Sequence, residues 1–412
     1  MTVGKNKTIS EKIFSRVTGR DCKAGDYVWA VPELIYIHDI FAPLVIQFFK
    51  RFKSKEIKYN GKLIFIQDHI FPPKDLQSAQ NILDMKMFSA NNGIEMINGG
   101  EGIEHTLLIE RGVIKPGMFV AGSDSHTVTA GAVGAMGVGL GSTDLAAILA
   151  MGASWFMVPE SILFKIIGKK GRYITGKDVI LEIISRIGVD GANYKSMEIS
   201  VDNSSKIDMD DRLAIANMTV EAGAKDGIIY EESYGNNDLY VKPDPGATYT
   251  HRDIIDLESL RPRISFPYSP GNVHDIKEAV GIKVDQVYIG NCSNGTYSDL
   301  VQAATVLKGQ VVKNGIKLII VPATRNIYLR ALKSGLIEIF LNSGAIIAPP
   351  SCGACAGLHM GVLGKGEVAI SNTNRNFRGR MGHPESKVFL ANSYVAALAA
   401  IEGKIEDPSE VL

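Results

Sequence analysis

The chain has 412 residues, too many for one ordinary hydrophobic core, and this length predicts two to four domains. Basic and acidic residues number 44 each, so the sequence lacks the basic excess of nucleic-acid and anionic-membrane surfaces. No apolar run reaches the roughly 18 residues of a membrane helix, and residues 1–14 lack the apolar core of a signal peptide. We therefore expect a cytoplasmic protein that binds neither nucleic acid nor membrane.

Short apolar strands alternate with helices along the chain, which predicts α/β layers with largely parallel sheets. Residues 162–205 are expected to form a smaller α/β unit. Residues 226–272 are rich in Gly, Pro, Asn, Asp and Tyr and predict a long irregular excursion near a domain boundary. Strands are expected at Leu63–Ile66, Met118–Ala121, Gln286–Ile289, Leu318–Val321 and Ala345–Ala348, and helices at Thr143–Met151, Lys177–Ile187 and Tyr394–Ile401.

Polar motifs directly follow four of the expected strands. They are Asp68-His69, Ser123–His126, Asn291-Cys292 and Ser351-Cys352. In open α/β sheets, ligands bind in the crevice at the carboxyl ends of the strands. The four motifs therefore predict one composite cleft.

Three of the four cysteines fall within these motifs. Cys352 and Cys355 form a C-x-x-C turn, and Cys292 lies in a separate Gly-Asn-Cys-Ser-Asn-Gly segment. Ordinary four-iron clusters use four cysteines, so three thiolates would leave one iron free for substrate. The spacing alone also allows a zinc half-site or a redox pair. Cys22 has no partner motif, and we interpret it as a bystander because four cysteines are too few for a disulfide framework.

Histidines beside carboxylates form a second candidate set. Asp68 adjoins His69, Asp124 lies two residues before His126, and His105 stands between these pairs in the sequence. A neighbouring carboxylate fixes the tautomer of a histidine and raises its pKa, which suits a general acid. A purely structural role is the alternative for any one of these histidines taken alone.

Two further segments have distinctive compositions. Arg375 and Arg380 lie in the turn Asn-Arg-Asn-Phe-Arg-Gly-Arg, and guanidinium groups bind carboxylates through two parallel hydrogen bonds. A solvated basic loop is the alternative interpretation. The glycine-rich run Gly131–Gly141 lacks the strand–turn–helix setting of a dinucleotide site, and we expect it to allow close backbone packing instead.

Four longer segments, taken together, resemble one family. They are GSDSHTVTAGAVGAMGVGLGSTD, IGNCSNG, PPSCGACAG and NTNRNFRGRMG, and their order and spacing extend along nearly the whole chain. They are similar to motifs of the aconitase family of iron–sulfur hydro-lyases. The resemblance implies three α/β/α domains around a central cluster cleft, which we place at residues 1–160, 161–275 and 276–412.

The resemblance also implies roles for individual residues. One 4Fe–4S cluster per chain would bind to Cys292, Cys352 and Cys355, with its open iron acting as a Lewis acid. Asn217 and Glu221, four residues apart, are expected to share one helix face. His38 and Asp39 are expected beside the cleft, and Asn376 beside the cluster. The implied catalytic residues are Asp68, His69, His105, Asp124, His126 and Glu221, and the implied substrate-binding residues are Ser125, Asn217, Arg375, Arg380, Asn374 and His38.

The reaction implied is an isomerisation of a small hydroxy acid by dehydration and rehydration. We expect 2-isopropylmalate and 3-isopropylmalate as its substrates, in leucine biosynthesis. Homoaconitate or methylmalate-type acids are alternatives, and a non-catalytic iron–sulfur protein is an alternative from another class. Because the chain ends at Leu412, soon after the last helix, the family's swivelling domain with its serine base is expected on a separate small subunit. Asn291 and Thr296 replace a serine and an arginine of the family pattern, which leaves the exact substrate open.

Overall fold

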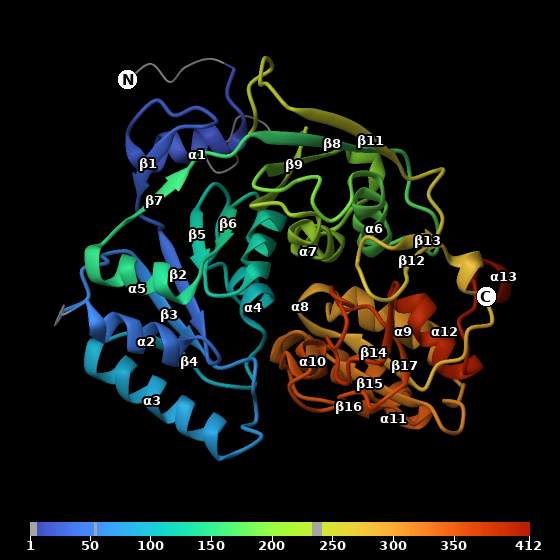
Figure 1. Cartoon of the computed structure of the whole chain (residues 1–412). Helices are drawn as coiled ribbons and strands as arrows, with labels where there is room; N and C mark the ends of the chain where they lie inside the picture. The colour runs from blue at the N-terminus through green and yellow to red at the C-terminus, as the bar shows by residue number, and fades with distance from the viewer. Residues whose placement is uncertain (1–5, 53–55, 233–240) are drawn as a thin grey trace.

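The computed structural model describes residues 6–52, 56–232 and 241–412 (Figure 1). The first part of the chain forms a five-stranded sheet in the order β4-β3-β2-β5-β6, with all neighbours parallel. Helices α2, α3 and α5 lie on one side of this sheet, and α4 lies on the side that faces the rest of the molecule. The elements are β2 (Leu34–His38), β3 (Lys62–Ile66), β4 (Glu95–Ile97), β5 (Phe119–Gly122), β6 (Met136–Gly139), α2 (Ala42–Arg51), α3 (Leu76–Asn92), α4 (Glu104–Glu110) and α5 (Ser142–Met151). Strands β2 and β5 are buried along their whole length, as expected for parallel strands covered on both faces.

The second part is a four-stranded parallel sheet in the order β10-β9-β8-β11. Its strands are β8 (Ser161–Ile167), β9 (Ser196–Val201), β10 (Asp226–Glu231) and β11 (His251–Asp256), and its helices are α6 (Gly176–Ile187) and α7 (Met209–Asn217). The irregular excursion expected at residues 226–272 is wrong where three strands form, at β10, at β11 and at residues 263–265. Strand β10 pairs with β9 along six residues and is largely buried, because tertiary packing outweighs the turn-forming composition of this stretch. Residues 233–240 of that stretch lie outside the described part.

The third part is a seven-stranded sheet in the order β13-β12-β18-β17-β14-β15-β16. Pairing is parallel from β18 to β16, and β12 is antiparallel to both of its neighbours. The strands are β12 (Arg263–Ser265), β13 (Val273–Asp275), β14 (Gln286–Gly290), β15 (Lys317–Val321), β16 (Ile346–Ile347), β17 (Val368–Ser371) and β18 (Lys387–Leu390). The helices are α8 (Asn291–Asn294), α9 (Tyr297–Leu307), α10 (Arg325–Lys333), α11 (Leu336–Ser343), α12 (Ser393–Glu402) and α13 (Pro408–Val411).

Smaller elements join these parts. Helix α1 (Ile9–Thr18) and the antiparallel pair β1 (Tyr27–Ala30) and β7 (Ser154–Met157) lie near the amino-terminal ends of β2 and β5 (Figure 1). The 3-10 helices are η1 (Ser125–Val133), η2 (Asn203–Ser205), η3 (Thr219–Ala222), η4 (Ile276–Ala279) and η5 (Gly353–Ala356). Among the described helices, none has the length and apolar character needed to cross a bilayer.

The domain boundaries can be located from the sheet to which each strand belongs, which changes at two points in the sequence. Strand β8 opens the second sheet at Ser161, next to the boundary expected after residue 160. Strands β12 and β13 already belong to the third sheet, although they precede the boundary expected after residue 275. We therefore propose the second domain limit between β11 and β12. The mixed α/β class and every strand and helix predicted by residue range are confirmed, with ends that differ by a few residues.

Candidate active site

One cavity of about 510 Å³ collects the polar strand ends of the first and third sheets. His38 ends β2, His69 follows β3, Asp124 follows β5, and Cys292 follows β14. Twelve of the predicted site residues line this cavity: His38, His69, His105, Asp124, Ser125, His126, Cys292, Cys352, Cys355, Asn374, Arg375 and Arg380. Asp68, Asn217 and Glu221 lie behind this layer and contact its members.

The three cysteine thiols are free and buried, and they come from two separate loops. The amide nitrogens of Asn217 and Asn374 lie 3.4 Å and 3.5 Å from the Cys292 sulfur and can donate to it. Burial raises the pKa of Cys292 to about 12, so this thiol ionises at neutral pH only when a cation binds. Among the described residues, the clusters of metal-binding side chains compact enough to hold one ion consist of histidines and aspartates, without a cysteine. Cys352 and Cys355 lie within side-chain hydrogen-bond range of each other, but the described residues contain no three-thiol set compact enough for one ion.

Hydrogen bonds from the first part of the chain hold the two cysteine loops. The amide of Cys352 donates to the Asp68 carbonyl at 3.0 Å, and the Thr106 hydroxyl donates to the Cys292 carbonyl at 2.9 Å. The Asn291 side chain connects the loops to each other, because its amide nitrogen donates to the Cys352 carbonyl at 2.8 Å. Asn291 has a φ of 91°, a left-handed conformation that asparagine tolerates better than most residues.

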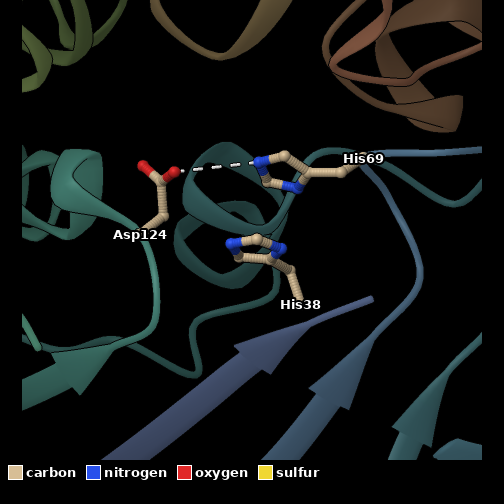
Figure 2. Close-up of side chains that lie close together, drawn as sticks. All are labelled: His38, His69 and Asp124. Carbon is tan, nitrogen blue, oxygen red and sulfur yellow. Dashed lines mark ion pairs between the residues drawn. The ribbon is translucent and has the colours of Figure 1, made fainter. Parts of the chain in front are cut away.

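His69 lies between two carboxylates, Asp68 and Asp124, and Figure 2 shows the second of them. Its Nδ1 donates to Asp68 at 2.8 Å, and its Nε2 lies 3.8 Å from Asp124 Oδ2. Burial alone would lower the pKa of His69, but the Asp68 carboxylate, the Cys352 thiol and Asp124 raise it well above 6.5. His69 is therefore charged at neutral pH and can donate a proton into the cavity.

His38 stacks on His69 at a ring distance of 3.8 Å and has the opposite protonation (Figure 2). Burial and the neighbouring His69 charge lower the pKa of His38 to about 3, so this ring is neutral. Its Nδ1 accepts the Ile40 amide, which leaves the proton on Nε2. That Nε2 has no protein partner among the described residues, and it is therefore available to donate to a ligand in the cavity.

Asp124 also organises the other two histidines. Its Oδ1 lies 3.2 Å from His105 Nε2 and 3.0 Å from His126 Nδ1. Burial would raise the pKa of Asp124, but hydrogen bonds from His105, His126 and His69 hold it well below 3.8. The Tyr36 hydroxyl lies 3.0 Å from the other ring nitrogen of His105, and Glu221 lies 3.0 Å from His126 Nε2. The rings of His69, His105 and His126 thus surround one ionised carboxylate.

Two arginines approach the cavity from the third part of the chain. Arg375 donates through Nε to Glu221 at 2.6 Å and through Nη2 to Ser125 at 2.8 Å. Arg380 lies against the cysteines: burial alone would lower its pKa, but Cys355 and Cys352 raise it. The buried Nε of Arg380 has no protein partner among the described residues. These guanidinium groups give the cavity the positive charge that a small dicarboxylic acid requires.

Several predicted placements need correction. Asn217 ends α7 and Glu221 lies in the separate helix η3, so the two do not share one helix face; the chain bends at Met218 between them. Asn376 points away from the cysteines and donates to Ser265 and to the carbonyls of Phe266 and Val388. Asp39 does not line the cavity and instead accepts the His69 and Ile70 amides. Thr296 is the buried N-cap of α9 and does not line the cavity.

Other residues at the site escaped sequence reasoning. Tyr36 occurs in the mainly apolar strand β2, and Thr106 in the short helix α4, and neither belonged to a motif that marked it. The cavity also has an apolar part, lined by Ile40, Phe41, Ile103, Leu140, Ala356 and Leu358. Only Ile40, directly after His38-Asp39, and Ala356, directly after Cys355, lie beside polar motifs that could have marked them.

The cavity brings three thiols together with acid–base histidines and arginines, on a fold of parallel α/β sheets. This combination defines a metalloenzyme that acts on a small anionic acid. A profile of the aconitase family (aconitate hydratase) matches residues 11–234 and 230–403, and the chain belongs to this family. Family membership implies a 4Fe–4S cluster, which fits the three free, buried thiols described above.

Full-length relatives and a solved structure are similar to the chain. The 3-isopropylmalate dehydratase large subunit 2 of Rubrobacter xylanophilus is 44% identical over 98% of each chain. The 3-isopropylmalate dehydratase large subunit of Caldanaerobacter subterraneus is 45% identical over 98% of this chain and 99% of its own. The structure of Thermococcus kodakaraensis aconitase X matches 95% of both chains, with a TM-score of 0.57 and 15% identity, and supports the fold alone.

Proposed function

We propose that the chain is the large catalytic subunit of an isopropylmalate isomerase, a hydro-lyase that interconverts 2-isopropylmalate and 3-isopropylmalate in leucine biosynthesis. The observation that carries the proposal is the single cavity in which three thiols face His69, Asp124 and two arginines. The choice of substrate rests on the full-length relatives, which bear the name of this enzyme's large subunit. A non-catalytic iron–sulfur protein would have no need of the charged acid–base set.

Cys292, Cys352 and Cys355 would hold one 4Fe–4S cluster. The donor set supports this assignment because it consists of three buried soft ligands with amide donors aimed at one sulfur. When bound, the cluster supplies a Lewis acid that makes hydroxide a better leaving group.

The protein's own residues would bind the acid and move its protons. Arg380 binds a substrate carboxylate, while Arg375 is oriented by Glu221 and Ser125. His69, charged by its contact with Asp68, donates a proton to the departing hydroxyl. His38 donates a hydrogen bond from Nε2 without changing its own charge. The apolar part of the lining, including Phe41 and Leu358, suits a branched hydrocarbon tail better than a third carboxylate.

The enzyme would be completed by a small subunit. The relatives are named as large subunits, which supports a separate small-subunit partner. We expect the base that removes the carbon-bound proton to come from that partner, and the isolated chain to have little activity.

Anaerobic co-purification with the small-subunit chain from the same genome tests the proposal. We expect a brown protein with about four iron and four sulfide per large chain. In a substrate panel, 3-isopropylmalate should turn over faster than homocitrate or methylmalate. Turnover of homocitrate without isopropylmalate would refute the substrate, and a colourless protein with stoichiometric zinc would refute the hydro-lyase itself.

A further inference from the structure

Lys177 is a buried cation outside the residues used above. It lies in the first turn of α6, and its side chain is fully buried. Its Nζ donates to the Thr373 carbonyl at 2.9 Å and lies 3.0 Å from the Met218 sulfur. Both partners are uncharged. Within the described residues, no carboxylate lies close enough to Lys177 to form an ion pair.

The position is unfavourable for an ammonium group in two ways. Burying an unpaired charge carries a large desolvation cost, even after the protein relaxes. The first turn of a helix also carries the positive end of its dipole, which repels a cation. A lysine at this position therefore needs a negative charge that its hydrogen bonds do not supply.

The charges that act on Lys177 come from two carboxylates and two of the candidate cluster cysteines, namely Asp299, Asp178, Cys355 and Cys292. Asp299 accepts from Thr296, Ser393 and Asn294, and Asp178 accepts from Thr175, Asn392 and the Arg263 amide. The two carboxylates are thus engaged in helix capping and loop contacts. Burial lowers the pKa of Lys177 to about 8, against the attraction of these groups, so the side chain remains mostly charged at neutral pH.

Lys177 also reaches the cysteines through one hydrogen-bonded connection. It holds the carbonyl of Thr373, and the next residue, Asn374, directs its side-chain nitrogen to the Cys292 sulfur at 3.5 Å. The same nitrogen donates to Asn217 Oδ1 at 2.9 Å. A continuous set of bonds therefore connects the buried Lys177 ammonium to the amide groups that donate to the Cys292 sulfur.

We infer that Lys177 is a positioning residue for the cluster: its buried ammonium balances the negative charge of the thiolate-bound cluster, and its bond to Thr373 fixes Asn374 beside Cys292. This inference rests on the proposed cluster. Net charge and hydrogen bonds around the sulfurs set the reduction potential of iron–sulfur centres. Removal of the ammonium should therefore make the reduced cluster harder to form.

The test compares wild-type and variant chains after anaerobic reconstitution with iron and sulfide. Lys177→Met removes the charge and the donor at similar length, Lys177→Gln keeps a donor without the charge, and Lys177→Arg keeps the charge. Two properties are measured: the midpoint potential, by dye-mediated titration followed by EPR, and the half-life of the bound cluster in EDTA. We expect Lys177→Met and Lys177→Gln to lower the midpoint potential and to shorten the half-life of the cluster about tenfold, as loss of outer-shell partners does. Lys177→Arg should stay close to wild type.

Lys170→Met is the matched control, because Lys170 precedes the same helix but pairs with Asp211. It should leave both properties unchanged. If Lys177→Met does not fold, as judged by circular dichroism, Lys177→Gln carries the test. A wild-type potential in the uncharged variant, or an equal fall in Lys177→Arg, would overturn the inference. A wild-type chain that binds no cluster would instead refute the proposed function.

Discussion

At the scale of single residues, Asp124 determines how the histidines of the site are arranged. It accepts from His105 and His126 and faces His69, so one ionised carboxylate orients three rings. A second carboxylate, Asp68, bonds to His69 but not to His38. This contact explains why His69 is charged while the His38 ring stacked on it is neutral. Neighbouring rings with opposite protonation are what acid–base chemistry at neutral pH requires.

Cys355→Ser should abolish cluster binding and turnover, because a serine hydroxyl is a poor ligand for iron in a thiolate site. The measurement is iron and sulfide per chain after anaerobic reconstitution, together with isomerase activity. Cys22→Ser is the matched control, since Cys22 is equally buried but contacts Thr18. Full iron content in Cys355→Ser would refute the ligand assignment.

Arg380→Lys should keep the cluster but raise KM about tenfold to a hundredfold, because an ammonium cannot form the paired hydrogen bonds of a guanidinium with a carboxylate. Steady-state kinetics on 3-isopropylmalate with the complete two-chain enzyme would measure this. Arg378→Lys is the control from the same segment, where the guanidinium lies over the Tyr268 ring at 5.1 Å. Unchanged kinetics in Arg380→Lys would remove this residue from the substrate site.

At the scale of elements, the glycine-rich run explains how a histidine loop and the second sheet can touch. Gly131 lies in η1, the same 3-10 helix that carries Ser125 and His126. A Cβ on Gly131 would lie 1.6 Å from the Gly227 carbonyl oxygen in β10. The run thus serves close backbone packing near the site, as the sequence predicts, and it positions His126 opposite Glu221.

Gly131→Ala should destabilise the protein by about 3 kcal/mol, since backbone atoms of β10 would have to move to admit the methyl group. Urea unfolding monitored by circular dichroism measures the change in unfolding free energy. Gly141→Ala is the control within the same run, because its new Cβ would meet only Asp144 at 3.5 Å and its φ is −68°. Equal stability of the two variants would contradict the packing explanation.

At the scale of the whole molecule, the first and third sheets meet at the cavity, and long-range hydrogen bonds connect the parts of the chain. Glu198 in β9 is one such link between the second sheet and the N-terminal helix. Its fully buried carboxyl group accepts the amides of Ile9 and Ser10 at the start of α1 and the hydroxyl of Tyr249. Burial raises the pKa of Glu198 to about 7, although these bonds oppose the shift.

This raised pKa predicts how stability depends on pH. The folded protein binds the Glu198 proton more tightly than the unfolded chain, whose glutamate has its ordinary pKa of 4.5. The contribution of Glu198 is therefore complete below pH 4.5 and is lost as the pH rises through about 7, by on the order of 3 kcal/mol. Glu198→Gln keeps an acceptor for the Ile9 amide but cannot ionise.

Unfolding free energies from urea titrations at pH 5 and pH 7.5 measure this effect. Glu198→Gln should lose less stability between the two pH values than wild type does. Asp226, whose pKa burial also raises to about 7, remains in both proteins and sets the residual slope. The exposed Glu258→Gln is the control and should keep the wild-type slope. An identical slope in Glu198→Gln would contradict the assignment.

The sequence by itself determined the elements and the chemical groups of the site. Strands such as β14 and helices such as α12 could be predicted from local apolar patterns. The polar motifs at the strand ends could be predicted as site residues because ligands bind at the carboxyl ends of parallel strands. Because the carboxyl ends of parallel strands gather at one edge, the convergence of Cys292 with Cys352 and Cys355 could be expected from spacing and resemblance.

Only the tertiary structure decided which neighbouring residues face the cavity. Asn374 reaches Cys292 while Asn376, two residues later, turns to β12 and β18. The pairing of β10 in the second sheet and the burial of Lys177 beneath Thr373 likewise depend on partners far away in the sequence. Local patterns fix the backbone conformation of a segment, but a side chain's partners depend on contacts formed only when distant segments pack.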